Sequence, residues 1–195
     1  VFIVVERLSE LEIINKVAKE INIKPNIGLR IKLISAGQGR WAESGGEYSK
    51  FGLNSMELVD ALDFAEKHEI KNCIRLIHFH LGSQITNIRR IKNSLKEVGR
   101  FYVEFRKSGC PIDYIDVGGG LGVDYDGSRS TYASSTNYTV QEYANDVVYH
   151  VLESCQEENL PHPNIISESG RAMTAYHSIL VFNVMDVTSF PEWSE

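Results

Sequence analysis

Cysteine is scarce in this sequence, and its arrangement excludes one class of protein. Cys73, Cys110 and Cys155 are the three cysteines, they lie far apart, and they form neither a CxxC pair nor the even-numbered set of a disulfide framework. A small disulfide-linked secreted scaffold is therefore excluded, and the pattern is typical of reduced thiols in a cytosolic protein. We expect a cytoplasmic protein with its cysteines in the core.

Long apolar runs and blocks of like charge are also missing. No run reaches the roughly 18 residues that a membrane-spanning helix needs, and the first residues lack the basic and then apolar pattern of a signal peptide. The net charge of -6 is distributed along the chain without the basic cluster that nucleic-acid binding requires. We therefore predict binding to neither membranes nor nucleic acids.

What is present is an alternation of strand and helix patterns over 195 residues, 43% of them hydrophobic, for which we expect a single domain over 1–195. Apolar or alternating stretches predict five strands, at 1–5, 27–33, 73–80, 112–117 and 165–168. Apolar residues at helical spacing predict four helices: the first is capped by Ser9, and the others begin at Ser55, residue 87 and Val140. A last apolar run covers 178–187.

About five strand-helix units predict an α/β protein with a parallel sheet, either open and doubly wound or closed as a barrel. Successive strand residues point to opposite faces, so His78 and His80 share one face, while Ile77 and Phe79 share the other. Strands of a doubly wound sheet are apolar on both faces, so this alternation favours part of a TIM-like (β/α)8 barrel. For Arg30, an exposed sheet edge stays an equal alternative.

A run of three glycines follows the fourth predicted strand, at Gly118, Gly119 and Gly120. Without Cβ atoms, the backbone amides can approach and point at an anion such as a phosphate. The run is not a dinucleotide-binding fingerprint, because no GxGxxG opens a helix there. A tight turn that needs positive φ angles is the alternative explanation.

Other types of catalytic centre find little support. His68, His150, His162 and His177 have no metal-ligand spacing, and the pair of His78 and His80 has no cysteine or carboxylate near it in the sequence. We therefore expect no zinc site and name no metal ligand. A serine nucleophile is not expected either, because there is no GxSxG motif.

Three motifs together resemble the pyridoxal-phosphate decarboxylases of the alanine-racemase-like barrel fold: HFHLGSQ at 78–84, DVGGGLGVDYDG at 116–127 and SESGRA at 167–172. Within that superfamily the sequence is most similar to the biosynthetic arginine decarboxylases. The resemblance runs from residue 1 to about 188 and includes GGEYSKFGL at 45–53. The related ornithine and diaminopimelate decarboxylases usually have EPGR where this chain has ESGR, which favours the arginine branch.

The resemblance implies a role for each matching residue. His80 would stack on the cofactor ring, and Glu168 would face its pyridine nitrogen and make the ring an electron sink; both count as catalytic. The cofactor phosphate would be held by Ser83, Gly118, Gly119, Gly120, Gly170 and Arg171, with Arg30 organising the network. The family's substrate-binding stretch corresponds to Asp116, Asp124 and Tyr125.

The resemblance also implies an activity and partners. The parent enzyme would convert L-arginine to agmatine and CO2 in polyamine (spermidine) biosynthesis, with pyridoxal 5'-phosphate, a possible magnesium ion and a homo-oligomeric assembly. The family's Schiff-base lysine and its cross-dimer cysteine match no position here. We therefore expect an internal fragment, inactive alone, whose exposed sheet edges are covered by association.

Three alternatives stay open from the sequence. In the first, the substrate is ornithine or diaminopimelate. In the second, the chain is a non-catalytic barrel module that only binds cofactor or protein. The third is an open, flavodoxin-like sheet whose glycine run holds a mononucleotide phosphate.

Overall fold

The computed structural model describes residues 1–36 and 49–189, so residues 45–48 of the GGEYSKFGL motif lie outside the described residues. Its centre is a parallel sheet in which the strands follow the order β1-β2-β3-β4-β5. Every strand pairs with its neighbour in the sequence. The strands are β1 (Ile3–Val5), β2 (Ile27–Arg30), β3 (Ile74–His78), β4 (Tyr114–Asp116) and β5 (Asn164–Ile166).

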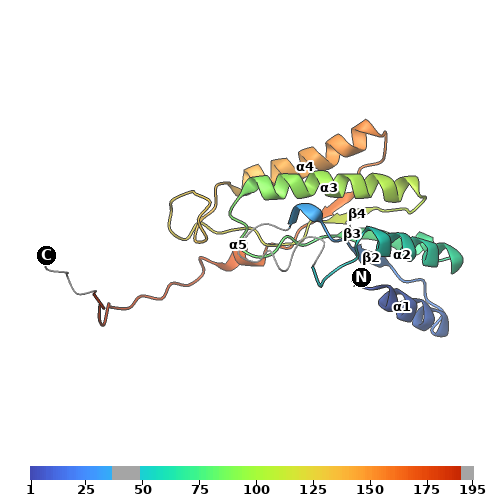
Figure 1. Ribbon diagram of the computed structural model, residues 1–195, viewed down its shortest axis with the longest axis horizontal. Helices are drawn as coiled ribbons and strands as arrows, with labels where there is room; N and C mark the ends of the chain where they lie inside the picture. Colours follow the sequence, from blue (N-terminus) through green and yellow to red (C-terminus); the bar gives the residue numbers. More distant parts are fainter. Residues whose placement is uncertain (37–48, 190–195) are drawn as a thin grey trace, which may run out of the picture.

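This sequential order decides between the two predicted architectures. A doubly wound sheet reverses its strand order at a switch point, whereas no reversal occurs among the five strands described here. The expectation of a barrel segment is therefore confirmed, and the flavodoxin-like alternative is wrong. Figure 1 shows α3 and α4 side by side along the sheet, followed by α2 and α1.

The helices begin where backbone amides find acceptors. They are α1 (Leu8–Glu20), α2 (Ser55–Lys67), α3 (Ile88–Lys107), α4 (Val140–Glu157) and the short α5 (Gly170–Thr174), with 3-10 turns at Ile34–Ala36 and Lys71–Cys73. Asn54 and Thr139 cap α2 and α4 by accepting from the amides of Glu57 and Glu142, as N-cap residues do.

The predicted cap at Ser9 is wrong, because Ser9 lies inside α1. The carboxylate of Glu10 accepts the backbone N–H groups of Glu6 and Arg7 at 2.7 and 3.3 Å. An acid in the first turn thus supplies the acceptors that the helix start requires, and the helix begins before the serine.

The hydrophobic core lies between the sheet and the helices. Leu29, Ile77 and Ile115 pair across β2, β3 and β4 and are fully buried. The helices α3 and α4 pack closely, because a Cβ atom on Gly99 would lie 2.1 Å from Oγ of Ser154. A larger residue in place of Gly99 would push these helices apart.

Four strands end before the predicted residue; β3 ends at His78 and not at 80, and β4 ends at Asp116 and not at 117. The second strand ends at Arg30 and not at residue 33, because the backbone of Lys32 donates to Leu53 O at 2.9 Å and Leu53 donates to Arg30 O at 2.8 Å. The fifth strand ends at Ile166. Glu168 therefore stands in the loop beyond the strand.

The apolar run at 178–187 forms neither strand nor helix. Its side chains are exposed, and the segment extends away from the sheet towards the C-terminus (Figure 1). A single domain that includes this segment therefore stays a prediction.

Two expectations from composition can be compared with the structure. All three cysteines are free; Cys110 and Cys155 are buried, as expected, whereas Cys73 is only half-buried. Burial raises the pKa of all three thiols. In the part of the chain that the structure describes, no helix is long and apolar enough to cross a membrane.

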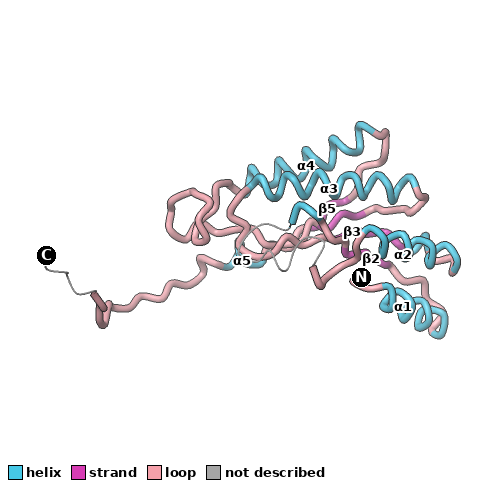
Figure 2. The backbone as a smooth tube through the Cα atoms, viewed as in Figure 1, coloured by secondary structure: helices cyan, strands magenta, loops and turns pink. Residues whose placement is uncertain are grey.

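The two ends of the sheet differ in the length of their connections. Figure 2 shows the long loops and α5 gathered at one end, where the strands terminate, and shorter turns at the other. The residues that follow the strands therefore converge at one end, which is where active sites of barrel folds are built.

Candidate active site

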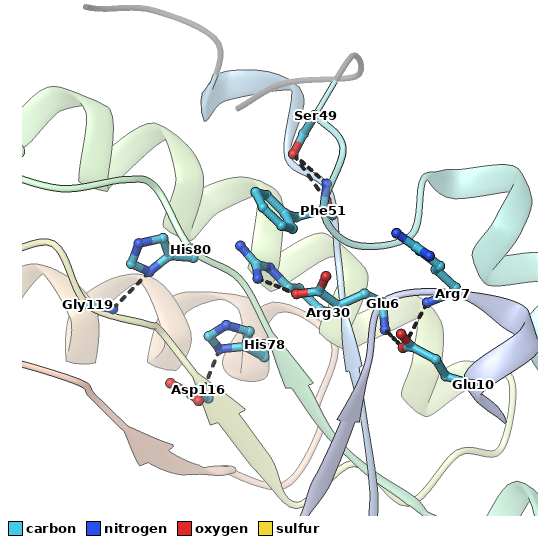
Figure 3. A network of polar contacts seen from close by, with 10 residues as sticks. All are labelled: Glu6, Arg7, Glu10, Arg30, Ser49, Phe51, His78, His80, Asp116 and Gly119. Carbon is cyan, nitrogen blue, oxygen red and sulfur yellow. Dashed lines mark hydrogen bonds and ion pairs between the residues drawn. The ribbon is translucent and has the colours of Figure 1, made fainter. Parts of the chain in front are cut away.

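Polar side chains form a continuous group at the carboxyl ends of the strands. Arg30 pairs with His78, and His78 pairs with Asp116, in the register of β2, β3 and β4. His80 lies two residues beyond His78, and Glu168 lies two residues beyond Ile166, the partner of Asp116 in β5. We call Arg30, His78, His80, Asp116 and Glu168 the polar rim (Figure 3 labels the first four).

His78 and Asp116 form a buried pair within the polar rim. Their Nδ1 and Oδ2 atoms lie 3.0 Å apart, and their side chains are 10% and 9% exposed. No carboxylate lies near the histidine pair in the sequence, but the pairing of β3 with β4 places Asp116, which is 38 residues further along the chain, next to His78.

Glu168 joins this pair. A ligand atom of each of His78, Asp116 and Glu168 lies within 4.8 Å of the other two, although Glu168 itself is exposed. Its backbone N–H donates to Gly118 O at 2.9 Å, so the loop after β5 is fixed to the glycine run. The cluster could hold a metal ion or present a carboxylate to a ligand.

The three glycines form a turn that is in close contact with both neighbouring loops. A Cβ atom would lie 2.3 Å from Phe79 O at Gly118, 2.2 Å from Glu168 O at Gly119 and 1.9 Å from Gly82 O at Gly120. No side chain fits at any of these positions. Gly118 and Gly120 also have positive φ angles, +65° and +96°, so the need for a tight turn is one reason for these glycines, and phosphate binding stays a prediction.

The amides of the glycine turn are not equally free. The N–H of Gly118 donates to Oδ1 of Asp116 at 2.9 Å, and that of Gly119 donates to Nδ1 of His80 at 3.4 Å. The N–H of Gly120 has no acceptor within the described residues. Of the three amides predicted to bind phosphate, Gly120 therefore offers the unoccupied donor, and Gly118 has a positional role.

His80 reaches the same turn from β3. Burial lowers the pKa of its imidazole, and the positive charge of Arg30 and the neighbouring His78 lower it further, although Glu168 and Asp116 oppose the shift. A neutral imidazole with Nδ1 as acceptor agrees with the contact from Gly119. The structure thus brings His80 and Glu168 to adjacent residues of one turn, Gly119 and Gly118.

A second group of polar side chains lies beside the turn. Arg171 of α5 donates to Tyr125 Oη at 3.1 Å and to Ser83 Oγ at 3.0 Å. None of the ion pairs among the described residues involves Arg171. A guanidinium with two hydroxyls and no carboxylate is suited to binding an anion such as phosphate.

The stretch predicted to bind substrate forms a loop whose polar groups contact one another. Asp124 accepts from Ser135 Oγ at 2.6 Å, and Tyr125 contacts Arg171. Asp116 stands apart from these two, in the buried pair with His78. The structure therefore does not bring the three predicted substrate residues together. Gly170, predicted beside the cofactor, begins α5.

Arg30 is held by residues that the sequence analysis did not identify. Its guanidinium forms an ion pair with Glu6 and lies 5.2 Å from the centre of the Phe51 ring, as Figure 3 shows. The exposed-edge alternative for Arg30 is wrong, because β2 lies between β1 and β3. The position of Glu6 directly after the first strand was the signal that could have identified it.

Gln84 is a second residue that the sequence analysis missed. Its side-chain amide donates to Val123 O at 2.7 Å and accepts from Val123 N–H at 2.9 Å. This paired contact fixes the chain immediately after the glycine run. Its place in the HFHLGSQ motif gave no indication of the role, because the contact spans 39 residues.

Comparisons with known proteins agree with this geometry. Residues 1–175 match the family model described as pyridoxal-dependent decarboxylase, pyridoxal binding domain. The chain is 53% identical over its whole length to a biosynthetic arginine decarboxylase of Bacteroides thetaiotaomicron. It is 55% identical, over 95% of its length, to one of Rhodopirellula baltica. It spans 31% and 28% of these two relatives.

Solved structures show the same similarity. The biosynthetic arginine decarboxylase of Campylobacter jejuni matches 87% of this chain with a TM-score of 0.75 and 40% identity, and 27% of that protein is covered. Diaminopimelate decarboxylase of Helicobacter pylori, solved with L-lysine, matches 88% with a TM-score of 0.69 and 26% identity, covering 40% of it.

Proposed function

The chain belongs to the pyridoxal-dependent decarboxylases, and from this membership we propose that the protein binds pyridoxal phosphate and decarboxylates L-arginine to agmatine. The observation that carries the proposal is the convergence of His80, Glu168 and the glycine turn, with Arg171 beside them. A flat neutral ring, an acid and an anion site are the three elements that hold this cofactor.

The residues present fit the cofactor on two observations. At the glycine turn, the lack of Cβ atoms lets the backbone pack against the neighbouring loops, and the Gly120 amide has no acceptor within the described residues. Arg171 donates to two neutral hydroxyls and can bind a phosphate without losing an ion pair. We propose that Ser83, Gly120 and Arg171 hold the phosphate.

The reaction breaks one carbon–carbon bond and replaces it with a carbon–hydrogen bond. The α-carboxylate leaves as CO2, the electron pair stays on Cα, and a proton then adds there. The bound cofactor supplies the electron sink that accepts this pair. The protein must therefore orient the substrate and stabilise positive charge on the ring nitrogen of the cofactor.

The polar rim supplies these functions in our proposal. The Glu168 carboxylate holds a proton on the ring nitrogen, because a negative charge favours the protonated form. The uncharged His80 packs its flat side against the ring, a contact worth about 1 kcal/mol. Arg30 is fixed by Glu6 and adds positive charge at the rim.

Arginine is the proposed substrate because identity to arginine decarboxylases is 53%, against 26% for diaminopimelate decarboxylase of H. pylori. We propose Asp124 and Tyr125 for substrate binding. Both oxygens of Asp116 are engaged, by His78 and by Gly118, so we propose that Asp116 supports the rim and does not contact substrate.

The test uses the protein expressed from its complete reading frame. We expect a pyridoxal phosphate absorbance band, release of CO2 from L-arginine and formation of agmatine, with ornithine and diaminopimelate turned over at least about a hundredfold more slowly. Faster turnover of either competitor would contradict the substrate proposal. Cofactor binding without any decarboxylation would favour the non-catalytic module.

A pair of variants separates ring chemistry from general loss of charge. Glu168→Gln should keep cofactor bound and reduce kcat by about two to four orders of magnitude, the usual range for a proton-holding side chain. Glu153→Gln is the matched control, since Glu153 lies on α4 and pairs with His150. Equal effects of the two substitutions would contradict the role of Glu168.

Location, assembly and metal binding are argued from other observations. A cytoplasmic location and a place in polyamine biosynthesis rest on the free thiols and on the arginine decarboxylase relatives. A homo-oligomer rests on apolar residues exposed at the first edge of the sheet, including Ile3 and Val4. Magnesium prefers all-oxygen ligands, so the cluster with His78 does not suit it.

A further inference from the structure

We propose that His78 is a positioning residue that holds Asp116 in the orientation needed to shape the glycine turn for the cofactor phosphate. The inference rests on the proposed function, because the turn is the proposed phosphate site. His78 itself would touch neither cofactor nor substrate, and it would act through Asp116.

The contacts form a continuous path across three strand ends. Nδ1 of His78 lies 3.0 Å from Oδ2 of Asp116, and Oδ1 of Asp116 accepts the N–H of Gly118 at 2.9 Å. The carbonyl of Gly118 then accepts the N–H of Glu168 at 2.9 Å. A displacement of Asp116 therefore reaches both the turn and the loop that carries Glu168.

Gly118 is the residue where this path controls the turn. Its φ angle is +65°, and a Cβ atom there would lie 2.3 Å from Phe79 O, so no side chain can help to orient its peptide. Asp116 supplies the acceptor for its N–H. The orientation of the following amides, including the free donor of Gly120, thus depends on where Asp116 stands.

His78 is the one polar side chain that Oδ2 of Asp116 contacts among the described residues. The Nδ1 atom of His78 is buried and forms no hydrogen bond of good geometry to any described group, Asp116 included, so the 3.0 Å contact with Oδ2 of Asp116 is the polar contact that holds the pair together. Without the imidazole, a buried carboxylate would keep one partner and lose the other, which leaves it free to rotate.

A second buried histidine allows a matched comparison. His150 on α4 is 6% exposed, and its Nδ1 lies 3.4 Å from Oε2 of Glu153. Like His78 it is a buried imidazole beside a carboxylate, but its partner contacts Tyr149 of the same helix and not the glycine turn. Removing it tests what a buried histidine contributes without the path to Gly118.

The experiment measures the affinity for pyridoxal phosphate, by absorbance titration, of variants made in the complete protein. We expect His78→Leu to bind about tenfold more weakly, the effect of losing one partner of a charged group. His78→Asn should recover binding to within about threefold, because its amide nitrogen can occupy the place of Nδ1. His150→Leu should bind like the unsubstituted protein.

Each outcome supports or overturns the positioning role. Unchanged affinity in His78→Leu, or equal weakening in His78→Asn, overturns it while leaving the proposed function intact. Failure of the unsubstituted protein to bind the cofactor overturns the proposed function itself. If His78→Leu does not fold, His78→Gln serves in its place, because the glutamine amide occupies the position of Nε2 and not that of Nδ1. The His78→Gln variant should also bind the cofactor about tenfold more weakly.

A double-mutant cycle tests the route of the effect. If His78 acts through Asp116, His78→Leu should weaken binding by less than about twofold once Asp116→Asn is present. Additive effects of the two substitutions would show that His78 acts by another route, and the inference would then be wrong.

Discussion

On the helix-covered face of the sheet, Leu29, Ile77 and Ile115 form a row of fully buried apolar side chains. The next residue along each of the three strands belongs to the polar rim. Apolar burial on the first face provides stability, whereas the second face presents a histidine–carboxylate pair and an arginine. Fold and chemistry therefore depend on adjacent residues of the same strands and should respond separately to substitution.

The largest expected difference between stability and cofactor binding comes from substituting two consecutive residues. Phe79→Ala should reduce the free energy of unfolding by about 3–5 kcal/mol, because Phe79 is 2% exposed in the core and truncation leaves a cavity. His80→Ala should cost less than about 1 kcal/mol and weaken cofactor binding instead. Thermal unfolding and cofactor titration of both variants check the prediction, and equal stability losses would contradict it.

The second prediction separates steric contact from backbone strain at glycine. Gly120→Ala should weaken cofactor binding by at least about thirtyfold, roughly 2 kcal/mol, because its Cβ would lie 1.9 Å from Gly82 O. Gly127→Ala is the matched control, with a φ of +72° and nothing within 4 Å. Its affinity for the cofactor should stay within about threefold; a similar loss at both sites would mean that strain alone is responsible.

The third prediction concerns the anion site beside the turn. Arg171→Met should weaken cofactor binding about thirtyfold, because a hydrogen bond to a charged group contributes about 1.5–3 kcal/mol. Tyr125→Phe removes one neutral hydroxyl next to the same guanidinium and should cost about threefold. Both are measured by cofactor titration, with unfolding midpoints as controls. A larger loss for Tyr125→Phe would mean that the hydroxyl and not the guanidinium holds the phosphate.

The smallest expected effect is a dependence of stability on pH at the polar rim. The pKa of His80 is lowered from 6.5, mainly by burial, so the unfolded chain binds more protons as the pH falls below 6.5. Stability without cofactor should therefore be complete above pH 6.5 and decline through the window below it. In the His80→Gln variant, the free energy of unfolding should change less with pH in that window. An unchanged dependence on pH would contradict the lowered pKa of His80.

Much of the fold follows from local patterns in the sequence. The start of α2 next to Asn54 and the alternation of Ile77 with His78 depend on neighbouring residues alone, so spacing predicted them. The end of β2 could not be predicted, because Leu53 donates to Arg30 O and accepts from the N–H of Lys32. Strand boundaries of this kind depend on the partner and not on the strand.

The candidate site shows the same limit. His80, Glu168 and the glycines stand in long motifs, so resemblance identified them. Strand register brings His78 next to Asp116 and Arg30 next to Glu6. The sequence alone does not reveal this register. Contacts between distant residues decided these roles, and only the assembled sheet reveals them.

The glycine turn has one further consequence, for the thermodynamics of ligand capture. Main-chain groups have no rotamers, and those at Gly118 and Gly119 are already immobilised by Asp116, His80 and Glu168. An anion arriving there orders little that was disordered, so its association should carry a small entropic penalty compared with capture by exposed, rotamer-rich side chains. Calorimetry of phosphate analogues should find the unfavourable entropy concentrated in the contribution of Arg171.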